Sequence, residues 1–219
     1  MDQIAKKLIA AKTSLEYIEE DCVLGVGTGS TVNAFIGLLP SIREKIDSIV
    51  SSSLATTRRL EELGFEVSML NSVGNIDVYV DGADEANKQL HLIKGGGGAL
   101  TREKILAGAA RKFICIVDDS KEVSMLGTFP LPIEVVPMGQ SFVARKMVEL
   151  RGQPIGRESF VTDNGNHILD IHNLQITNPL EMETHINQIP GVVTVGLFAH
   201  RPADVLLVAS DTGVRVVEN

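Results

Sequence analysis

The chain has 219 residues, of which 44% are hydrophobic and 22% are charged, proportions typical of a globular protein and not of a disordered one. Its 20 basic and 28 acidic side chains leave a formal net charge of -8, which argues against a nucleic-acid or anionic membrane surface but not against a small anionic ligand. No apolar stretch approaches the ~20 residues of a membrane span, and the N-terminus lacks a signal-peptide pattern, so we expect a soluble, cytoplasmic protein.

The N-terminal segment predicts a helix, because its apolar residues recur near the helical period and would form one buried stripe. These residues are Ile4, Leu8, Leu15 and Ile18. Beyond this helix, short apolar runs alternate with helical stretches. The expected strands are 22–27, 46–50, 65–70, 76–80 and 112–117, and the expected helices begin at Ser30, near residue 58 and near residue 102.

Strands that are apolar along their whole length, separated by helices, predict a Rossmann-like, mostly parallel α/β sheet with helices on both faces. Ligands of such sheets bind beyond the carboxyl ends of the strands. We therefore look for chemistry in the loops that follow the strands.

After Gly127 the pattern changes. The order of expected elements is β-α-β-β-α-β, which is ferredoxin-like. The elements are a strand at 131–137, a helix at 141–150, a type I′ hairpin over 160–171 around Asn164-Gly165, a helix capped by Asn178 and a strand at 192–198. We predict a main α/β domain at 1–127 and 200–219, to which strands 204–209 and 214–217 return, and a smaller α+β domain at 128–199.

Cysteine and histidine give little sign of chemistry. Cys22 and Cys115 each lie in an apolar, strand-like run, which predicts buried thiols rather than a disulfide framework. His167 and His172 fall on opposite faces of an expected strand, so we expect no zinc site there.

The segment GVGTGST (25–31) stands between an expected strand and an expected helix. Its glycines let backbone N–H groups converge on an anion, and the helix N-terminus and hydroxyls add donors. Ser30 replaces the third glycine of a dinucleotide fingerprint, and no lysine completes a Walker loop. A cradle for one phosphate is one interpretation; a tight turn with Ser30 or Thr31 as helix cap is the other.

The segment DGADE (81–85) directly follows the strand expected at 76–80, so three carboxylates crowd the end of one strand. They could form a solvated turn, hold Mg²⁺, or accept hydrogen bonds and protons from sugar hydroxyls. Spacing alone does not decide among these interpretations.

Lys94 stands before four consecutive glycines, Gly95 to Gly98, and a helix is expected after them. Glycine costs roughly 0.5–1 kcal/mol of chain entropy per residue relative to alanine, which predicts that something closely approaches this backbone. The lysine and the helix favour an anion or oxyanion site, and a flexible surface loop is the alternative.

Glu103 lies in the first turn of that helix, where acids are common because they complement the helix dipole. We expect Thr101 to be the N-cap, which makes Lys104 the third helical residue. The carboxylate of Glu103 would then lie outside a capping box.

Taken together, several segments resemble the ribose-5-phosphate isomerase family of the A type. They are GVGTGST (25–31), SSS (51–53), DGADE (81–85), KGGGGALTREK (94–104) and TDNGN (162–166), and the resemblance extends to FPLPIEV (129–135) and IPGVVTVGLFA (189–199). Members of this family interconvert D-ribose 5-phosphate and D-ribulose 5-phosphate without a cofactor. The resemblance therefore implies a pentose 5-phosphate as partner, no cofactor, no metal, no nucleic acid, and a homodimer or sometimes a tetramer.

The resemblance also implies roles for individual residues. Glu103 would be the proton acceptor, Asp81 and Asp84 would contact the sugar hydroxyls, and residues 94–97 would line the site. The negative charge that develops on oxygen needs a fixed cation, for which Lys94 and the adjacent glycine amides are candidates. The substrate-binding residues would be Thr28, Gly29, Ser30, Thr31, Asp81, Gly82, Ala83, Asp84, Lys94, Gly95, Gly96, Gly97 and Lys121, with the phosphate near Ser30 and Thr31.

Two alternatives belong to other classes of function. Coenzyme A transferases share the general fold and use a glutamate as nucleophile, but their chains are generally longer and their glutamate motif is absent here. A sugar-phosphate sensor is the other alternative. Regulators of that type carry a helix-turn-helix and a basic surface, whereas this chain is acidic.

Overall fold

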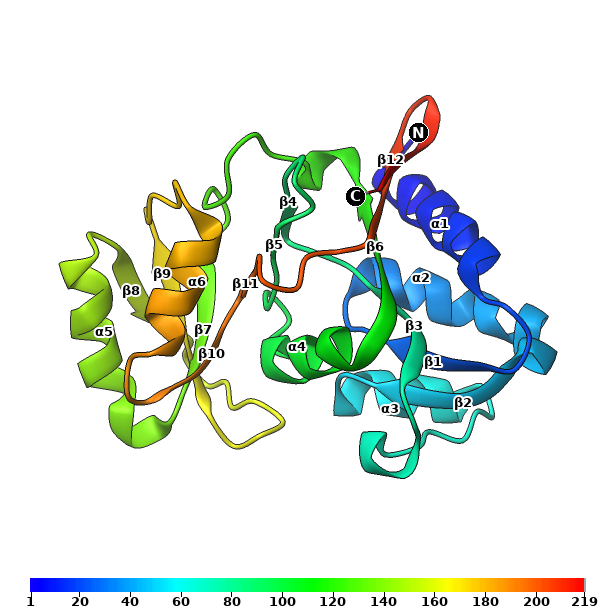
Figure 1. Cartoon of the computed structure of the whole chain (residues 1–219), viewed down its shortest axis with the longest axis horizontal. Coiled ribbons are helices and arrows are strands. Elements are labelled where there is room, and N and C mark those ends of the chain that lie inside the picture. Colours follow the sequence, from blue (N-terminus) through cyan, green and yellow to red (C-terminus); the bar gives the residue numbers. More distant parts are fainter. Residues whose placement is uncertain (219) are drawn as a thin grey trace. The chain divides into compact units, whose positions relative to one another are not determined.

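The computed structural model describes residues 1–218, which divide into two compact units (Figure 1). The first unit comprises Met1–Gly82, Arg102–Glu122 and the described residues from Ala203 onward, and the second comprises Ala83–Thr101 and Val123–Pro202. We expected residues 83–101 in the main domain. The structure groups them with the second unit, because one strand of this segment, Leu92–Ile93, pairs with a strand at Leu197–Phe198.

A mostly parallel sheet forms the centre of the first unit, in the order β13-β12-β6-β3-β1-β2. Neighbouring strands run parallel except β12 and β13, which are antiparallel. The predicted α/β class is confirmed. The strands are β1 (Cys22–Val26), β2 (Ile46–Ser51), β3 (Ile76–Asp81), β6 (Ala110–Asp118), β12 (Val205–Ser210) and β13 (Gly213–Glu218).

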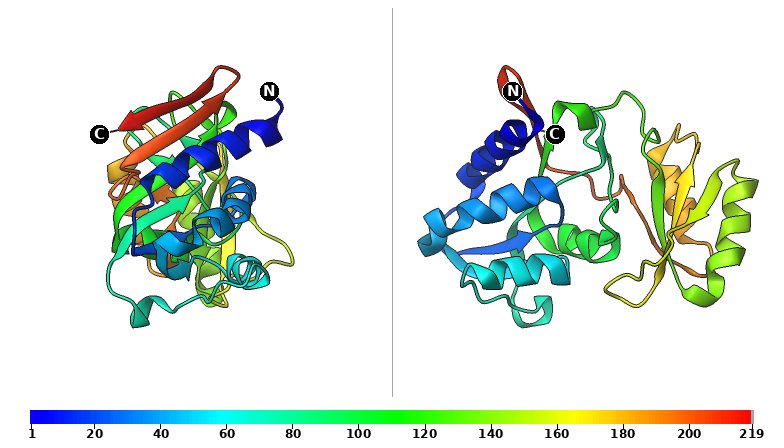
Figure 2. Two further views of the ribbon diagram at one scale, coloured as in Figure 1. Left: turned by 90° about the vertical axis from the view of Figure 1, so that its right-hand side faces the viewer. Right: turned by 180° about the vertical axis from the view of Figure 1, so that it is seen from behind.

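Helices cover both faces of this sheet, as the sequence predicts. In Figures 1 and 2, α2 and α3 lie on opposite sides of β1, and α1 packs against α2 and β6. The helices are α1 (Gln3–Ser14), α2 (Ser30–Leu38), α3 (Leu54–Glu62) and α4 (Leu100–Ala109). Short 3-10 helices are η1 (Leu15–Tyr17), η2 (Leu39–Lys45), η3 (Leu70–Ser72) and η4 (Asp119–Lys121).

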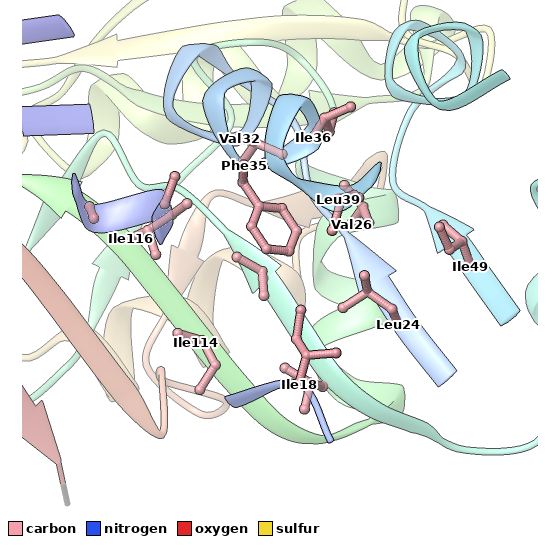
Figure 3. Close-up of a cluster of buried hydrophobic side chains, with 14 of the residues drawn as sticks. Ile18, Leu24, Val26, Val32, Phe35, Ile36, Leu39, Ile49, Ile114 and Ile116 are labelled. Carbon is pink, nitrogen blue, oxygen red and sulfur yellow. The ribbon is translucent and has the colours of Figure 1, made fainter. Parts of the chain in front are cut away.

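Apolar side chains of α2 and of the central strands form the core of this unit (Figure 3). The fully buried ring of Phe35 projects from α2 into the cluster. The labelled members of the cluster are Ile18, Leu24, Val26, Val32, Phe35, Ile36, Leu39, Ile49, Ile114 and Ile116. Cys22 and Cys115 are buried thiols, as expected, and burial raises the pKa of Cys22 to about 11.

The apolar stripe predicted for the first helix is wrong in its N-terminal half. Ile4 is 78% exposed and Leu8 is 46% exposed. The buried positions of α1 are instead the small residues Ala10, Ala11 and Ser14. Small side chains let the helix backbone approach α2 and β6 closely, so packing distance rather than side-chain hydrophobicity selects the buried face.

The strand predicted at 65–70 is also wrong. A single parallel bridge joins Val67 to Ile49 at the edge of the sheet, and the chain then enters η3. Met69 is 73% exposed, so this run lacks the burial that would extend the pairing. An apolar run next to an edge strand is therefore not sufficient to form another strand.

The second unit contains an antiparallel sheet in the order β10-β7-β9-β8. The chain order β7-α5-β8-β9-α6-β10 confirms the predicted ferredoxin-like unit. The side chain of Asn178 caps α6 by accepting a hydrogen bond from the Glu181 amide, also as predicted. The elements are β7 (Leu131–Val135), η5 (Pro137–Gly139), α5 (Gln140–Glu149), β8 (Gln153–Gly156), β9 (His167–His172), α6 (Pro179–Asn187) and β10 (Val192–Val195).

The hairpin predicted over 160–171 differs in the structure. Its first strand is β8, which ends at Gly156, and residues 157–166 form a long connection to β9. Within the described backbone, Gly165 has a positive φ of 79° but Asn164 does not, which excludes the type I′ turn. The side chain of Asn164 instead turns toward the buried Glu134.

A small third sheet in the order β11-β5-β4 completes the second unit and was not predicted. It pairs β4 (Glu85–Ala86), β5 (Leu92–Ile93) and β11 (Leu197–Phe198). The strand expected at 192–198 is therefore split at Gly196 between β10 and β11. No helix in the described part of the chain is both long and apolar enough to cross a membrane.

Candidate active site

The loop between β1 and α2 lies against the carboxyl end of β3, because these two strands are neighbours in the parallel sheet. The amide of Thr28 donates a hydrogen bond to Oδ1 of Asp81 over 3.0 Å. A Cβ atom on Gly27 would lie 2.0 Å from Cγ of Asp81, so only glycine permits this approach. The structure thus brings two of the predicted motifs together within the first unit.

Asp81 is fully buried, and its carboxylate organises this junction. Oδ1 also accepts a hydrogen bond from the Gly82 amide over 2.7 Å, and Oδ2 accepts one from the hydroxyl of Tyr79. Burial, followed by the charges of Asp81 and Glu103, raises the pKa of Tyr79 well above its ordinary value. Tyr79 was missed in the sequence, although its place two residues before Asp81 on β3 puts both on the same face of the strand.

The hydroxyl of Thr28 joins the SSS segment to the loop. Its Oγ1 lies 2.8 Å from Oγ of Ser52 and 2.9 Å from Oγ of Ser53. Ser53 also caps α3, because its side chain accepts a hydrogen bond from the Thr56 amide. The loop after β1 is therefore held from β3 on one side and from the start of α3 on the other.

Ser30 and Thr31 are the first two residues of α2, and Gly29 is its N-cap, so the interpretation of Ser30 or Thr31 as helix cap is wrong. Nζ of Lys7, on α1, donates a hydrogen bond to Oγ of Ser30 over 2.9 Å, and this contact is exposed. A helix N-terminus, two hydroxyls and an ammonium group together suit a phosphate. Lys7 was missed because a lysine on a surface helix gives no signal in the sequence.

Glu103 is 3% exposed and lies in the first turn of α4. Its charge contributes, after burial and the charge of Asp81, to the raised pKa of Tyr79. The predicted N-cap is wrong: α4 begins at Leu100, so Thr101 is its second residue. The hydroxyl of Thr101 instead donates to the carboxylate of Glu134.

Lys121 ends η4, the 3-10 helix that directly follows β6. Asp118 caps this helix, because its Oδ1 accepts a hydrogen bond from the Ser120 amide over 3.0 Å. Burial by itself would raise the pKa of Asp118, but the hydrogen bonds from the Ser120 hydroxyl and amide, together with Gln3 and the charge of Lys121, outweigh it, and the pKa is lowered. Asp118 therefore fixes the short helix that carries Lys121.

The remaining predicted residues, Ala83, Asp84 and Lys94 to Gly97, lie in the second unit. Oδ2 of Asp84 accepts a hydrogen bond from the Gly96 amide over 2.8 Å. A Cβ atom on Gly96 would lie 2.5 Å from Oδ1 of Asp84, so the close approach expected from the glycine run is present. Lys94 is 2% exposed, and its Nζ lies 5.5 Å from the centre of the Phe198 ring.

The glycine run is held in place and is not a flexible loop. The Gly98 amide donates to the Gly95 carbonyl over 2.9 Å. The guanidinium of Arg157 donates to the Gly95 and Gly96 carbonyls at 3.4 and 3.2 Å. Arg157 is itself fixed by two hydrogen bonds to Asp170, at 2.9 and 2.6 Å. These hydrogen bonds from Arg157 were not predicted, because an arginine about 60 positions after the glycine run gives no local signal in the sequence.

Glu85, the third acid of the DGADE segment, has a structural partner. It is 3% exposed, and its two carboxylate oxygens accept hydrogen bonds from the Gly127 and Phe129 amides at 2.7 and 2.5 Å. The three carboxylates that stand close together in the sequence therefore have different hydrogen-bond partners in the structure. Asp81 binds the loop after β1, Asp84 the glycine run, and Glu85 the segment before β7.

The sequence matches the family described as ribose 5-phosphate isomerase A (phosphoriboisomerase A) over residues 48–213. The chain belongs to this family. The isomerase prediction is thus confirmed, in preference to the acyl-transfer and sensor alternatives.

Solved structures agree with this assignment. Ribose 5-phosphate isomerase A from Neisseria gonorrhoeae is 46% identical, with 99% of this chain and 97% of that chain covered and a TM-score of 0.97. A D-ribose-5-phosphate isomerase in complex with phospho-erythronic acid is 40% identical, with all of both chains covered (100%) and a TM-score of 0.96. The enzyme of Methanocaldococcus jannaschii is 33% identical, again with 100% of both chains covered and a TM-score of 0.93.

Proposed function

We propose that this isomerase interconverts D-ribose 5-phosphate and D-ribulose 5-phosphate without a cofactor, through an enediolate, in the non-oxidative pentose phosphate pathway. Glu103 is the general base in this scheme. The observation that carries the proposal is the burial of the Glu103 carboxylate in the first turn of α4, where its charge and that of Asp81 act on one tyrosine hydroxyl. A carboxylate shielded from bulk water can take a proton from carbon with little competing solvation.

The proposed reaction moves one proton between two carbons. The carboxylate of Glu103 removes the proton from C2 of the open-chain aldose, which leaves an enediolate with negative charge on O1. The proton on O2 passes to O1, and Glu103 returns its proton to C1 to give the ketose. No group leaves and no electrons are exchanged with another molecule.

The sugar oxygens need donors and acceptors in this scheme. Lys94 and the amides of Gly95 to Gly97 stabilise the charge that develops on oxygen. Asp81 and Asp84, with the backbone of Gly82 and Ala83, bind the hydroxyls and relay their protons. The hydrogen bond from the Gly96 amide to Asp84 supports this role, because it fixes the orientation of the carboxylate.

The phosphate binds at the N-terminus of α2. Gly29, Ser30 and Thr31 supply backbone and hydroxyl donors there, Lys7 and Lys121 supply positive charge, and Thr28 holds the loop in place. A phosphate held away from the reacting carbons contributes binding energy that fixes their position.

One solved relative is in complex with phospho-erythronic acid. The carboxylate of such a sugar acid has the planar, negatively charged form of an enediolate. We therefore propose that this chain also binds phospho-erythronic acid, and that the compound competes with ribose 5-phosphate. The compound also reports on site integrity when a variant has lost turnover.

The assembly and its location stay proposals that rest on family resemblance. We propose a homodimer, with a tetramer as the alternative, that works in the cytoplasm. The buried thiols Cys22 and Cys115 suit a reducing compartment.

Glu103→Gln tests the proposed base. The amide keeps the shape of the side chain but cannot accept the C2 proton, so turnover of ribose 5-phosphate should fall by about 10²–10⁴-fold with KM nearly unchanged. A coupled assay measures the turnover, and calorimetry with phospho-erythronic acid shows whether the site is intact.

Glu183→Gln is a matched control, because Glu183 is also a buried helical glutamate but accepts hydrogen bonds from the Ala199 and His200 amides. Its turnover should stay close to that of the wild type. Wild-type turnover in Glu103→Gln would remove Glu103 from the role of base.

A further inference from the structure

Glu134 is an acid in the middle of an otherwise apolar strand, β7, and it is fully buried. Burying a carboxylate costs several kcal/mol unless hydrogen bonds compensate for the lost water. Oε1 of Glu134 accepts hydrogen bonds from the Thr162 hydroxyl at 2.9 Å and from the side-chain amides of Asn164 and Asn166 at 3.1 and 2.8 Å. Oε2 accepts one from the hydroxyl of Thr101 and a longer one, at 3.5 Å, from the side-chain amide of Asn164.

The TDNGN segment (162–166) supplies most of these donors, and hydrogen bonds within the segment hold them in place. The Thr162 amide donates to the Asn166 carbonyl, and the Gly165 amide donates to the Thr162 carbonyl, each over 2.9 Å. The Thr162 hydroxyl also accepts hydrogen bonds from the amides of Asn164 and Asn166 at 3.2 and 3.1 Å. The donors around Glu134 are therefore preorganised. The proposed reaction gives this segment no role.

Thr101 connects the buried carboxylate of Glu134 to α4, the helix that carries Glu103. It is the second residue of α4, and Glu103 lies in the same first turn. The helix starts at Leu100, two residues after Gly98, and the Thr101 side chain links this start to the buried carboxylate on β7. A hydrogen bond from Thr101 to a fixed carboxylate therefore sets the position of the turn on which Glu103 lies.

We propose that Glu134, held by residues 162–166, is a positioning residue that fixes the first turn of α4 through Thr101 and so aims the carboxylate of Glu103 at the substrate. The proposal rests on Glu103 being the base. The placement matters because a shift of about 1 Å in a reacting group can cost about 10²-fold in rate. Removing the contact thus slows the chemical step and leaves substrate binding intact.

Thr101→Val tests the proposal, since it removes the hydroxyl and leaves Glu134 its donors from the loop. We expect kcat for ribose 5-phosphate to fall by about 10- to 100-fold, with KM within about twofold. Thr101→Ser restores the donor and should recover most of the lost kcat. Thr13→Val is the matched control, because the Thr13 hydroxyl donates to the Ile9 carbonyl within α1, and it should leave kcat unchanged.

Glu134→Gln provides a second, independent variant. Its kcat should also fall, and adding Thr101→Val to it should cost little more, because both changes break the same link. Thermal unfolding and binding of phospho-erythronic acid show that each variant is folded with an intact site. Should Glu134→Gln fail to fold, the Thr101 pair decides alone.

A Thr101→Val enzyme with wild-type kcat, or one in which only KM changes, would overturn the proposal. So would a loss of kcat that Thr101→Ser does not recover. Failure of the proposed function is distinguishable, because it shows as wild-type turnover in Glu103→Gln. A slow Glu103→Gln enzyme beside a fast Thr101→Val enzyme rejects the positioning role alone.

Discussion

The buried carboxylate of Asp81 links the loop after β1 to the end of β3. Its Oδ1 accepts hydrogen bonds from the amides of Thr28 and Gly82, and its Oδ2 accepts one from Tyr79. A buried carboxylate needs such donors to replace the hydrogen bonds that it loses from water. The same carboxylate therefore fixes the loop proposed to bind phosphate and stands in the environment proposed for proton transfer.

Tyr79→Phe isolates one of these contacts. The phenyl ring keeps the packing against Phe113, whose ring centre lies 5.0 Å away, and only the O–H group is lost. We expect the free energy of unfolding to fall by about 1–3 kcal/mol, because a buried carboxylate loses a donor. KM for ribose 5-phosphate should rise as the Thr28 loop loosens.

Urea unfolding and steady-state kinetics measure the two effects of this substitution.

A spectrophotometric titration of the wild-type protein adds a third readout, the ionisation of Tyr79. Because the pKa of Tyr79 is raised in the folded state, its neutral form stabilises the fold below pH ~10, and this stability is lost as the pH rises further. Tyr79 should ionise only when the protein unfolds at high pH. Ionisation of Tyr79 in the native enzyme near pH 10, or an unchanged unfolding free energy in Tyr79→Phe, would contradict this account.

Residue-level prediction from sequence succeeded where a motif carries a local signal. Ser30 at the start of α2 and the close approach at Gly96 both follow from short-range spacing. Tyr79 could have been found from strand alternation, and Glu134 from an acid within an apolar strand. Lys7 and Arg157 could not, since their partners lie far away in the chain.

At the level of elements, η4 shows how a short helix depends on one cap. Asp118 ends β6 and accepts hydrogen bonds from the Ser120 amide and hydroxyl, which start the 3-10 helix that ends at Lys121. Nε2 of Gln3 lies 3.5 Å from Oδ2 of the same carboxylate. A lysine proposed to bind phosphate is thus placed by a carboxylate at the end of a central strand.

Asp118→Asn should weaken this cap in a pH-dependent way. The pKa of Asp118 is lowered in the folded state, so its ionised form stabilises the fold above the unfolded pKa of about 3.9, and this contribution is lost as the pH falls through the folded value. We expect the variant to be less stable than wild type by about 1–2 kcal/mol at pH 7, with the difference shrinking below pH ~4. Urea unfolding at several pH values measures it. A difference that stays constant down to pH 3 would show that the charge of Asp118 has no part in it.

Several elements were predicted well, and the errors have physical causes. Asn178 correctly marked the start of α6. The run 65–70 lost its strand because only Val67 finds a partner at the sheet edge. The hairpin at Asn164 was misplaced because asparagine side chains there bind a buried carboxylate, a long-range contact that turn statistics do not contain.

At the scale of the whole molecule, the alternation of strands and helices was enough to predict both the parallel sheet and the ferredoxin-like unit. The third sheet was missed because β4, β5 and β11 are two residues long each, too short to show any periodicity. These pairings draw residues 83–101 into the second unit. Domain boundaries that depend on the pairing of two-residue strands cannot be predicted from sequence periodicity.

The three acids of the DGADE segment make Mg²⁺ binding one interpretation of the sequence, which can be tested on the whole enzyme. Among residues 1–218 no three side chains of His, Cys, Asp or Glu are grouped to hold a metal ion. Asp81 and Asp84 each accept a hydrogen bond from a backbone amide, so these carboxylate oxygens already have partners in the protein. We therefore expect protein stripped with EDTA to turn over ribose 5-phosphate at the untreated rate, with no gain from added Mg²⁺. The assay needs EDTA-treated coupling reagents and an untreated sample as control. A strict requirement for Mg²⁺ would return Asp81 and Asp84 to the role of metal ligands and remove them from proton relay.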